Sequence, residues 1–176
     1  MAGDVLPFSF SHHLIIMHKK VPGASERALA RFTERARRAA GIAGRLNVLV
    51  SSNREIRHLN HQFRGKDKST DVLSFPADPA MNSALAGEIA IAAETAIANA
   101  RRLQHSTLDE LKILILHGVI HLAGFDHEGD KGQMARKEAE LRDRFGLPNS
   151  LIARTHLGGN SHGKGARRST ARRSSR

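Results

Sequence analysis

The chain has 176 residues, which is enough for one domain with its own hydrophobic core. It contains no Cys, which excludes disulfides and leaves His, Asp and Glu as the side chains that can hold a metal. The net charge is +11, no apolar run approaches the roughly 20 residues that span a bilayer, and the N-terminal residues lack the pattern of a signal peptide. We therefore expect a cytoplasmic protein that does not enter a membrane.

Short apolar segments alternate with helical patterns in the first half of the chain. Ser25 is suited to cap a helix that Gly41 ends, and Ser52 with Glu55 three residues later forms a capping-box pattern. These signals predict strands at residues 14–17 and 46–50, and helices at residues 25–40 and 53–63.

The second half predicts two further strands, at residues 71–76 and 87–92, and an Ala-rich helix at residues 94–103. Another capping pattern, Ser106 with Asp109, opens a strongly apolar helix, and a last helix covers residues 131–144. The expected fold is a single α+β domain, with a small mixed sheet of about four strands covered by helices.

Three histidines follow the apolar run of residues 111–116. His117 and His121 are four residues apart, so both imidazoles leave the same face of a helix. Gly124 can end that helix, and the chain can then return His127 to the same point. Three imidazoles with a fourth position left open are the arrangement of a catalytic zinc.

Chance also produces two histidines at this spacing, so the pair alone does not establish a metal site. The third histidine after a glycine strengthens the interpretation. The apolar helix does so too, because an unsatisfied polar group buried in it would cost roughly 1–3 kcal/mol.

The spacing is close to the long zinc-protease motif, in which a Glu directly after the first His serves as general base. Here that position is Gly118, which has no side chain. We therefore expect a zinc-protease-like metal helix without the usual chemistry of peptide hydrolysis.

A polar loop between the second helix and the third strand carries Arg64, Lys66 and Lys68. A guanidinium offers a fork of donors matched to phosphate oxygens, and loops on a rigid scaffold often carry binding groups. An exposed basic loop without a binding role explains the same residues.

The C-terminal segment from Arg154 contains seven Lys or Arg and no Asp or Glu, and is rich in Gly and Ser. We expect a folded domain over residues 1–153 and a disordered basic tail over residues 154–176. A mobile arginine arm is typical of nucleic-acid binding, although a solubilising extension has the same composition.

Together, these segments resemble the YbeY family of bacterial endoribonucleases, also called rRNA maturation factors. Residues 117–127 match its signature H-G-x-x-H-L-x-G-x-D-H throughout. The loop of residues 64–76 and the segment of residues 87–91 are similar to its other patterned regions. The resemblance extends over roughly residues 12–147 and leaves the basic tail outside it.

The resemblance implies a zinc-dependent endoribonuclease, specific for single strands, that acts in 16S rRNA 3′-end maturation and ribosome quality control. It implies one Zn²⁺ ion per chain on His117, His121 and His127, with Arg64 and His117 as catalytic residues, and rRNA and the small ribosomal subunit as partners. The ion would polarise a phosphate oxygen or a water, and Arg64 would stabilise the transition state. Lys66 and Lys68 would hold the RNA backbone.

Several points stay open from the residues alone. Asp126 could orient a ligand imidazole, or could be only a cap or turn residue. No general base can be named, nickel suits three imidazoles as well as zinc does, and no protein partner can be named. The competing functions are a non-catalytic rRNA-binding assembly factor with a structural metal, and a metalloprotease.

Overall fold

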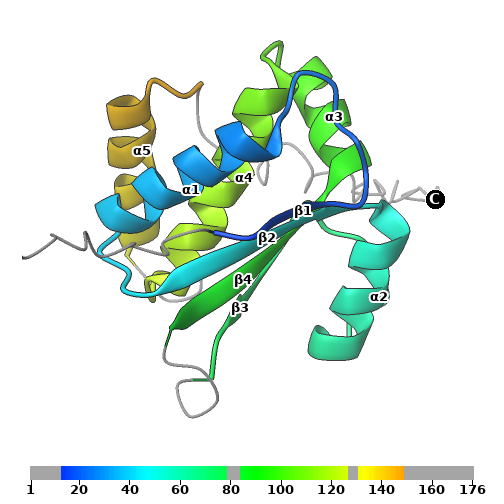
Figure 1. Ribbon diagram of the computed structural model, residues 1–176, viewed down its shortest axis with the longest axis horizontal. Helices are drawn as coiled ribbons and strands as arrows, with labels where there is room; N and C mark the ends of the chain where they lie inside the picture. Colours follow the sequence, from blue (N-terminus) through cyan, green and yellow to red (C-terminus); the bar gives the residue numbers. More distant parts are fainter. Residues whose placement is uncertain (1–12, 79–83, 127–130, 149–176) are drawn as a thin grey trace, which may run out of the picture.

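The computed structural model describes residues 13–78, 84–126 and 131–148, which form one α+β unit (Figure 1). This confirms the predicted class, a small mixed sheet covered by helices. The predicted tail, residues 154–176, lies outside the described residues. The elements in chain order are β1 (Ile15–Met17), α1 (Glu26–Ala39), β2 (Arg45–Ser51), α2 (Asn53–Arg64), β3 (Val72–Pro76), β4 (Leu85–Ala92), α3 (Ala93–Arg102), α4 (Thr107–Leu122) and α5 (Gln133–Phe145).

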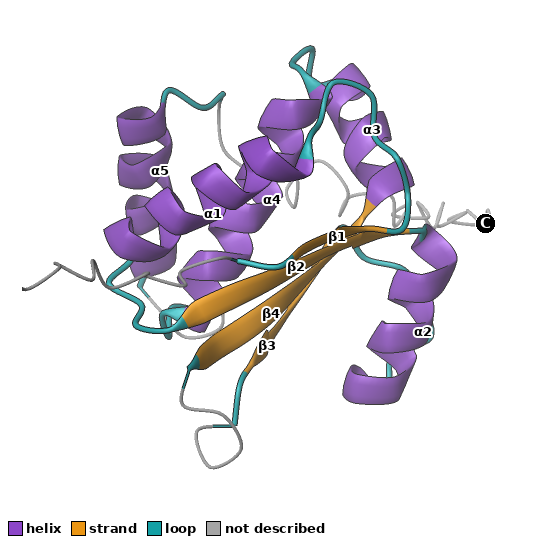
Figure 2. Ribbon diagram, viewed as in Figure 1, coloured by secondary structure: helices purple, strands orange, loops and turns teal. Residues whose placement is uncertain are grey.

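The four strands form one sheet in the order β1-β2-β4-β3. β1, β2 and β4 are parallel, and β3 is antiparallel to β4. The register places Val48 opposite both Ile15 and Ile89, and all three are buried. Figure 2 shows α1, α3, α4 and α5 on one face of the sheet and α2 on the other.

The core is built around α4, whose residues 113–116 are all fully buried. This apolar segment has to be enclosed, and α4 packs against α1, α3, α5 and the sheet. Among the described residues, no helix is long and apolar enough to cross a membrane.

The predicted helix starts are confirmed by their caps. The side chains of Ser25, Ser52 and Ser106 each accept a hydrogen bond from a backbone N–H in the first turn of the following helix. The predicted boundaries differ from the observed ones by one or two residues. Leu14, for example, lies just outside β1, although its carbonyl accepts a hydrogen bond from Val48 at 2.8 Å.

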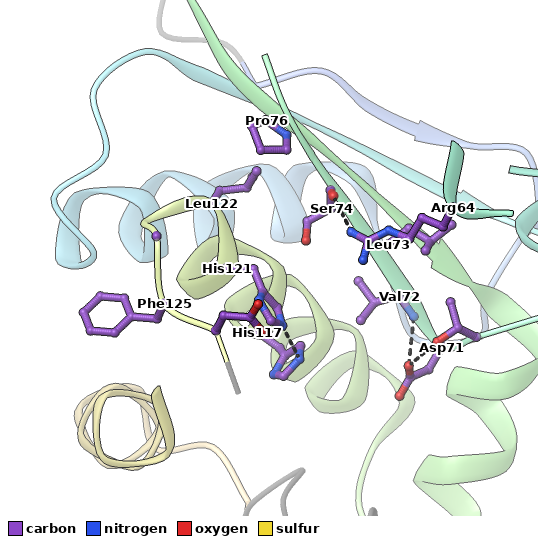
Figure 3. A pocket seen from close by; sticks show the side chains of 13 residues that line it. Arg64, Asp71, Val72, Leu73, Ser74, Pro76, His117, His121, Leu122 and Phe125 are labelled. Carbon is purple, nitrogen blue, oxygen red and sulfur yellow. Dashed lines mark hydrogen bonds between the residues drawn. The ribbon is translucent and has the colours of Figure 1, made fainter. Parts of the chain in front are cut away.

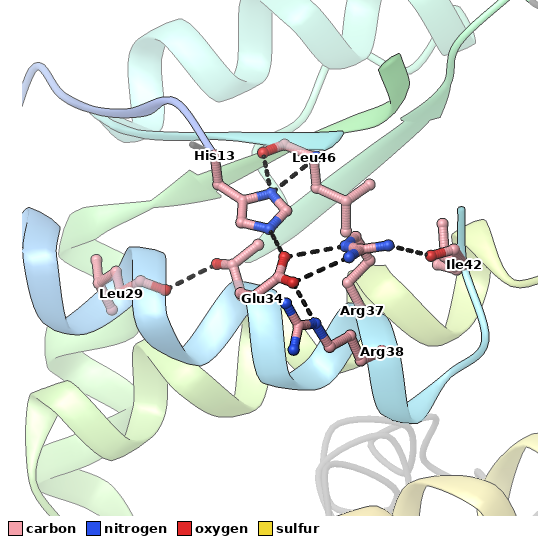
Figure 4. Close-up of polar contacts among 8 residues, drawn as sticks. His13, Leu29, Glu34, Arg37, Arg38, Ile42 and Leu46 are labelled. Carbon is pink, nitrogen blue, oxygen red and sulfur yellow. Dashed lines mark hydrogen bonds and ion pairs between the residues drawn. The ribbon is translucent and has the colours of Figure 1, made fainter. Parts of the chain in front are cut away.

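A buried histidine ties the start of β1 to α1 and β2 (Figure 4). Nε2 of His13 lies 2.5 Å from a carboxylate oxygen of Glu34, and its Nδ1 lies 3.0 Å from both the N and O atoms of Leu46. Arg37 and Arg38 also donate to Glu34. Hydrogen bonds from Arg37 lower the pKa of Glu34, burial opposes them, and His13 and Arg38 bring the pKa down to about 2.

Candidate metal and RNA site

A cleft of about 450 Å³ opens between the C-terminal half of α4, strand β3 and the end of α2 (Figure 3). The two histidines on α4 and the arginine at the end of α2 face it. Its polar lining residues are Arg64, Thr70, Asp71, Ser74, His117, His121 and Asp126.

His117 and His121 present their ring nitrogens to each other on the side of α4 that faces the cleft, and both are half-buried. The two Nε2 atoms are 3.2 Å apart, with ring centroids 4.7 Å apart at an interplanar angle of 82°. The two imidazoles therefore lie together, and their binding of a metal stays a prediction.

This spacing fits a metal. Two nitrogens on a tetrahedral zinc, each about 2.0–2.1 Å from it, lie about 3.3 Å apart. His121 also lies in the last turn of α4, where the helix dipole favours a positive charge. A third ligand is needed to complete the predicted site. His127 lies outside the described residues, so its place as that ligand stays a prediction.

The orientation of His117 is set by a carboxylate on α5. Nδ1 of His117 lies 3.0 Å from Oε2 of Glu138, whose side chain is only 1% exposed. Burial raises the pKa of Glu138, but the hydrogen bond from His117 and the charge of Arg142 outweigh it and hold the pKa below its ordinary value. Glu138 is therefore ionised near neutral pH and accepts a hydrogen bond from Nδ1–H.

Glu138 was missed by the sequence interpretation, which considered Asp126 as the partner of a ligand imidazole. Asp126 lines the cleft, and its contact with an imidazole stays a prediction. The available signal was a carboxylate four residues after Met134 on the buried side of the last helix. Such a buried acid needs a partner, but the sequence does not say which helix supplies it.

Arg64 is placed by the end of α2. Gly65 adopts the left-handed conformation with φ 67°, which ends the helix, and Phe63 packs edge-on against Phe75 of β3. One guanidinium nitrogen of Arg64 donates to the carbonyl of Ser74 at 3.1 Å. Its side chain therefore lies along β3 at the cleft, on the side facing the histidines (Figure 3).

The loop after Arg64 is held by a hydrogen bond to α2. The side-chain amide of Asn60, which is buried, donates to the carbonyl of Lys68 at 2.7 Å. Lys66 and Lys68 are both exposed and are not among the described residues that line the cleft. Their predicted contact with the RNA backbone would therefore be made outside the cleft and stays a prediction.

Gly118 faces away from the cleft, towards the sheet. A Cβ atom at this position would lie 3.0–3.1 Å from three side-chain atoms of Ile89 in β4. Any longer side chain would be directed into the core, so this position could not supply a base to the cleft.

Comparisons with known proteins identify the family. A family profile described as Endoribonuclease YbeY matches residues 9–146. A protein named Endoribonuclease YbeY from Koribacter versatilis (strain Ellin345) is 56% identical over 142 residues, which cover 81% of this chain and 91% of the relative. Its namesake from Solibacter usitatus (strain Ellin6076) is 40% identical over 141 residues, which cover 79% and 92%.

The fold has a solved counterpart. The solution structure of a Thermotoga maritima protein is 28% identical, with a TM-score of 0.51, and the match covers 87% of this chain and 100% of that one. The family profile spans the sheet, the cleft and both described histidines. The chain therefore belongs to the YbeY endoribonuclease family.

Proposed function

We propose that this protein is a zinc-dependent endoribonuclease that cuts single-stranded RNA in its α4–β3 cleft. The observation that carries the proposal is the pair of Nε2 atoms 3.2 Å apart, facing the same cleft as Arg64. Membership of an endoribonuclease family supplies the class of substrate.

The metal would be held by His117 and His121, with His127 as the predicted third ligand. The ion, when bound, supplies Lewis acidity towards a phosphate oxygen or a water. Zinc suits imidazole ligands, and so does nickel, so metal analysis of the purified protein is part of the test. The supporting observation is that the Nδ1 contact with Glu138 leaves Nε2 of His117 as the ligating atom.

Arg64 would bind the scissile phosphate. One nitrogen of its guanidinium donates to the carbonyl of Ser74, and a guanidinium carries five N–H donors in all. The planar fork matches phosphate oxygens, and the charge stabilises the additional negative charge of the pentavalent transition state. The bond to Ser74 keeps the side chain at the cleft before RNA arrives.

An open cleft lined by backbone and side chains of β3 favours a single strand. RNA bases in a duplex are stacked and paired, so a scissile phosphate is most accessible where the strand is unpaired. We further propose that the substrate is precursor 16S rRNA on the small ribosomal subunit, cut during 3′-end maturation and quality control in the cytoplasm. The basic residues from Arg154 would add non-specific affinity for rRNA.

The decisive experiment incubates the purified protein with short single-stranded and duplex RNAs of the same sequence, with and without a chelator. We expect cleavage of the single strand only, lost on chelation and restored by zinc. Binding of RNA without cleavage, with full zinc occupancy, would instead favour the non-catalytic assembly factor with a structural metal. A peptide-library digest tests the metalloprotease, which the packing of Gly118 against Ile89 argues against.

A further inference from the structure

We propose that Glu138 and Arg142 form a positioning pair that fixes the tautomer and ring orientation of His117 for metal binding. This inference rests on the metal site of the proposed function and adds two residues of α5 to it.

The two carboxylate oxygens of Glu138 are divided between two partners. Oε2 lies 3.0 Å from Nδ1 of His117, and Oε1 lies 2.6 Å from the NH2 nitrogen of Arg142. The side chains of Glu138 and Arg142 are 1% and 3% exposed, so their ion pair is shielded from water. One carboxylate oxygen thus pairs with the guanidinium of Arg142, and the other contacts the imidazole of His117.

The contact selects one form of His117. A carboxylate accepts hydrogen bonds, so Nδ1 has to carry the proton, and in the neutral ring Nε2 then keeps its lone pair. Nε2 is the atom that faces His121 across 3.2 Å. The opposite tautomer would place the Nδ1 lone pair against the carboxylate and a proton on the ligating atom.

Arg142 keeps the carboxylate in place. Its NH1 nitrogen donates to the carbonyl of Pro148 at 2.7 Å, so the guanidinium is fixed on both sides. A buried carboxylate without a cation would carry a large desolvation penalty. Arg142 supplies the cation that offsets this penalty, while the other carboxylate oxygen of Glu138 contacts His117.

A purely structural role explains this arrangement less well. Buried ion pairs contribute little to stability compared with apolar residues of similar volume. The same helix carries a surface pair, Lys137 with Glu140, at 3.0 Å, and there the Glu140 side chain is 61% exposed. The surface pair therefore forms without burying its carboxylate. Glu138 is buried, and at this buried position it contacts the imidazole of His117.

The test compares the parent protein with Glu138→Gln and with the double variant Glu138→Leu/Arg142→Met, with Glu140→Gln as the matched control on the same helix. The double variant removes both buried charges together, so it should fold even if a single substitution does not. Two quantities are measured: the zinc dissociation constant by competition with a chelator, and the tautomer of His117 by ¹⁵N NMR of the metal-free protein.

We expect zinc affinity to fall about 10- to 100-fold in both Glu138 variants and to stay unchanged in Glu140→Gln. The parent should show protonated Nδ1 on His117, and the double variant should show a mixture of tautomers. An unchanged tautomer in the double variant, or zinc affinity within about twofold of the parent, would overturn the positioning role. If the parent bound no zinc, the proposed function would fail, and the tautomer measurement would still decide whether Glu138 orients His117.

Discussion

A Cβ atom on Gly118 would lie 3.0 Å from Cγ2 of Ile89. The backbone of α4 at Gly118 therefore packs directly against the side chain of Ile89 in β4. His117, the preceding residue, faces the cleft instead. The sequence indicates that a general base is missing at position 118. The structure adds the reason: a side chain at position 118 would point at Ile89 in the core and not into the cleft.

Gly118→Ala should therefore destabilise the protein by about 1–3 kcal/mol, because the added methyl group overpacks the contact with Ile89. In an Ile89→Ala background the same substitution should cost nothing, or should stabilise by up to about 1 kcal/mol, since Ala favours a helix more than Gly does. Urea unfolding of the four proteins of this cycle measures the coupling. An equal cost in both backgrounds would show that Gly118 is not required by the contact.

Arg64→Ala should abolish RNA cleavage and leave zinc binding intact. Substitution removes the exposed hydrogen bond to the carbonyl of Ser74, so the loss of stability should stay near 1 kcal/mol. Cleavage rates on a short single-stranded RNA and zinc content are measured together. Arg54→Ala, at the exposed start of the same helix, is the control and should cut at the parent rate. A parent-like rate in Arg64→Ala would remove Arg64 from the chemistry.

The sequence predicted most of the fold because its signals are local. Serine caps, terminal glycines and one apolar helix each act within a few residues, and Ser52, Gly41 and Gly124 occupy such positions in the structure. The strand order is not local. β2 pairs with β4, although α2 and β3 lie between them in the sequence, and no local signal indicates this pairing.

The candidate site, like the fold, could be predicted only where its residues lie close together in the sequence. The spacing of His117 and His121 on one helix is enough to bring their imidazoles together. The partner of His117 comes from α5, 21 residues later, and nothing in the spacing identifies Glu138 as that partner. Contacts between elements far apart in the chain require the packing of the helices to be known.

His121→Ala and His127→Ala should each lose zinc, because each removes one of the three proposed ligands. Elemental analysis of the purified variants measures the metal per chain, and the unfolding temperature shows whether the metal also stabilises the fold. His58→Ala, at an exposed position of α2, should retain one zinc. Full occupancy in His127→Ala would show that another residue completes the site.

Glu34→Gln should lower stability at neutral pH, and the effect should fade in acid. The pKa of Glu34 is lowered from 4.5 to about 2, so its ionised form stabilises the folded state above pH 4.5 and loses that effect as the pH falls through 2. Its side chain is 20% exposed, and the shift corresponds to about 2 kcal/mol once solvent screening is allowed for. Urea unfolding at pH 7 and pH 3 should show the difference between parent and variant shrinking by roughly half. Glu140→Gln, which removes an exposed ion pair, is the control and should differ little from the parent in stability at either pH. If the stability difference between the parent and Glu34→Gln were the same at both pH values, His13 and Arg37 would not hold a charged carboxylate.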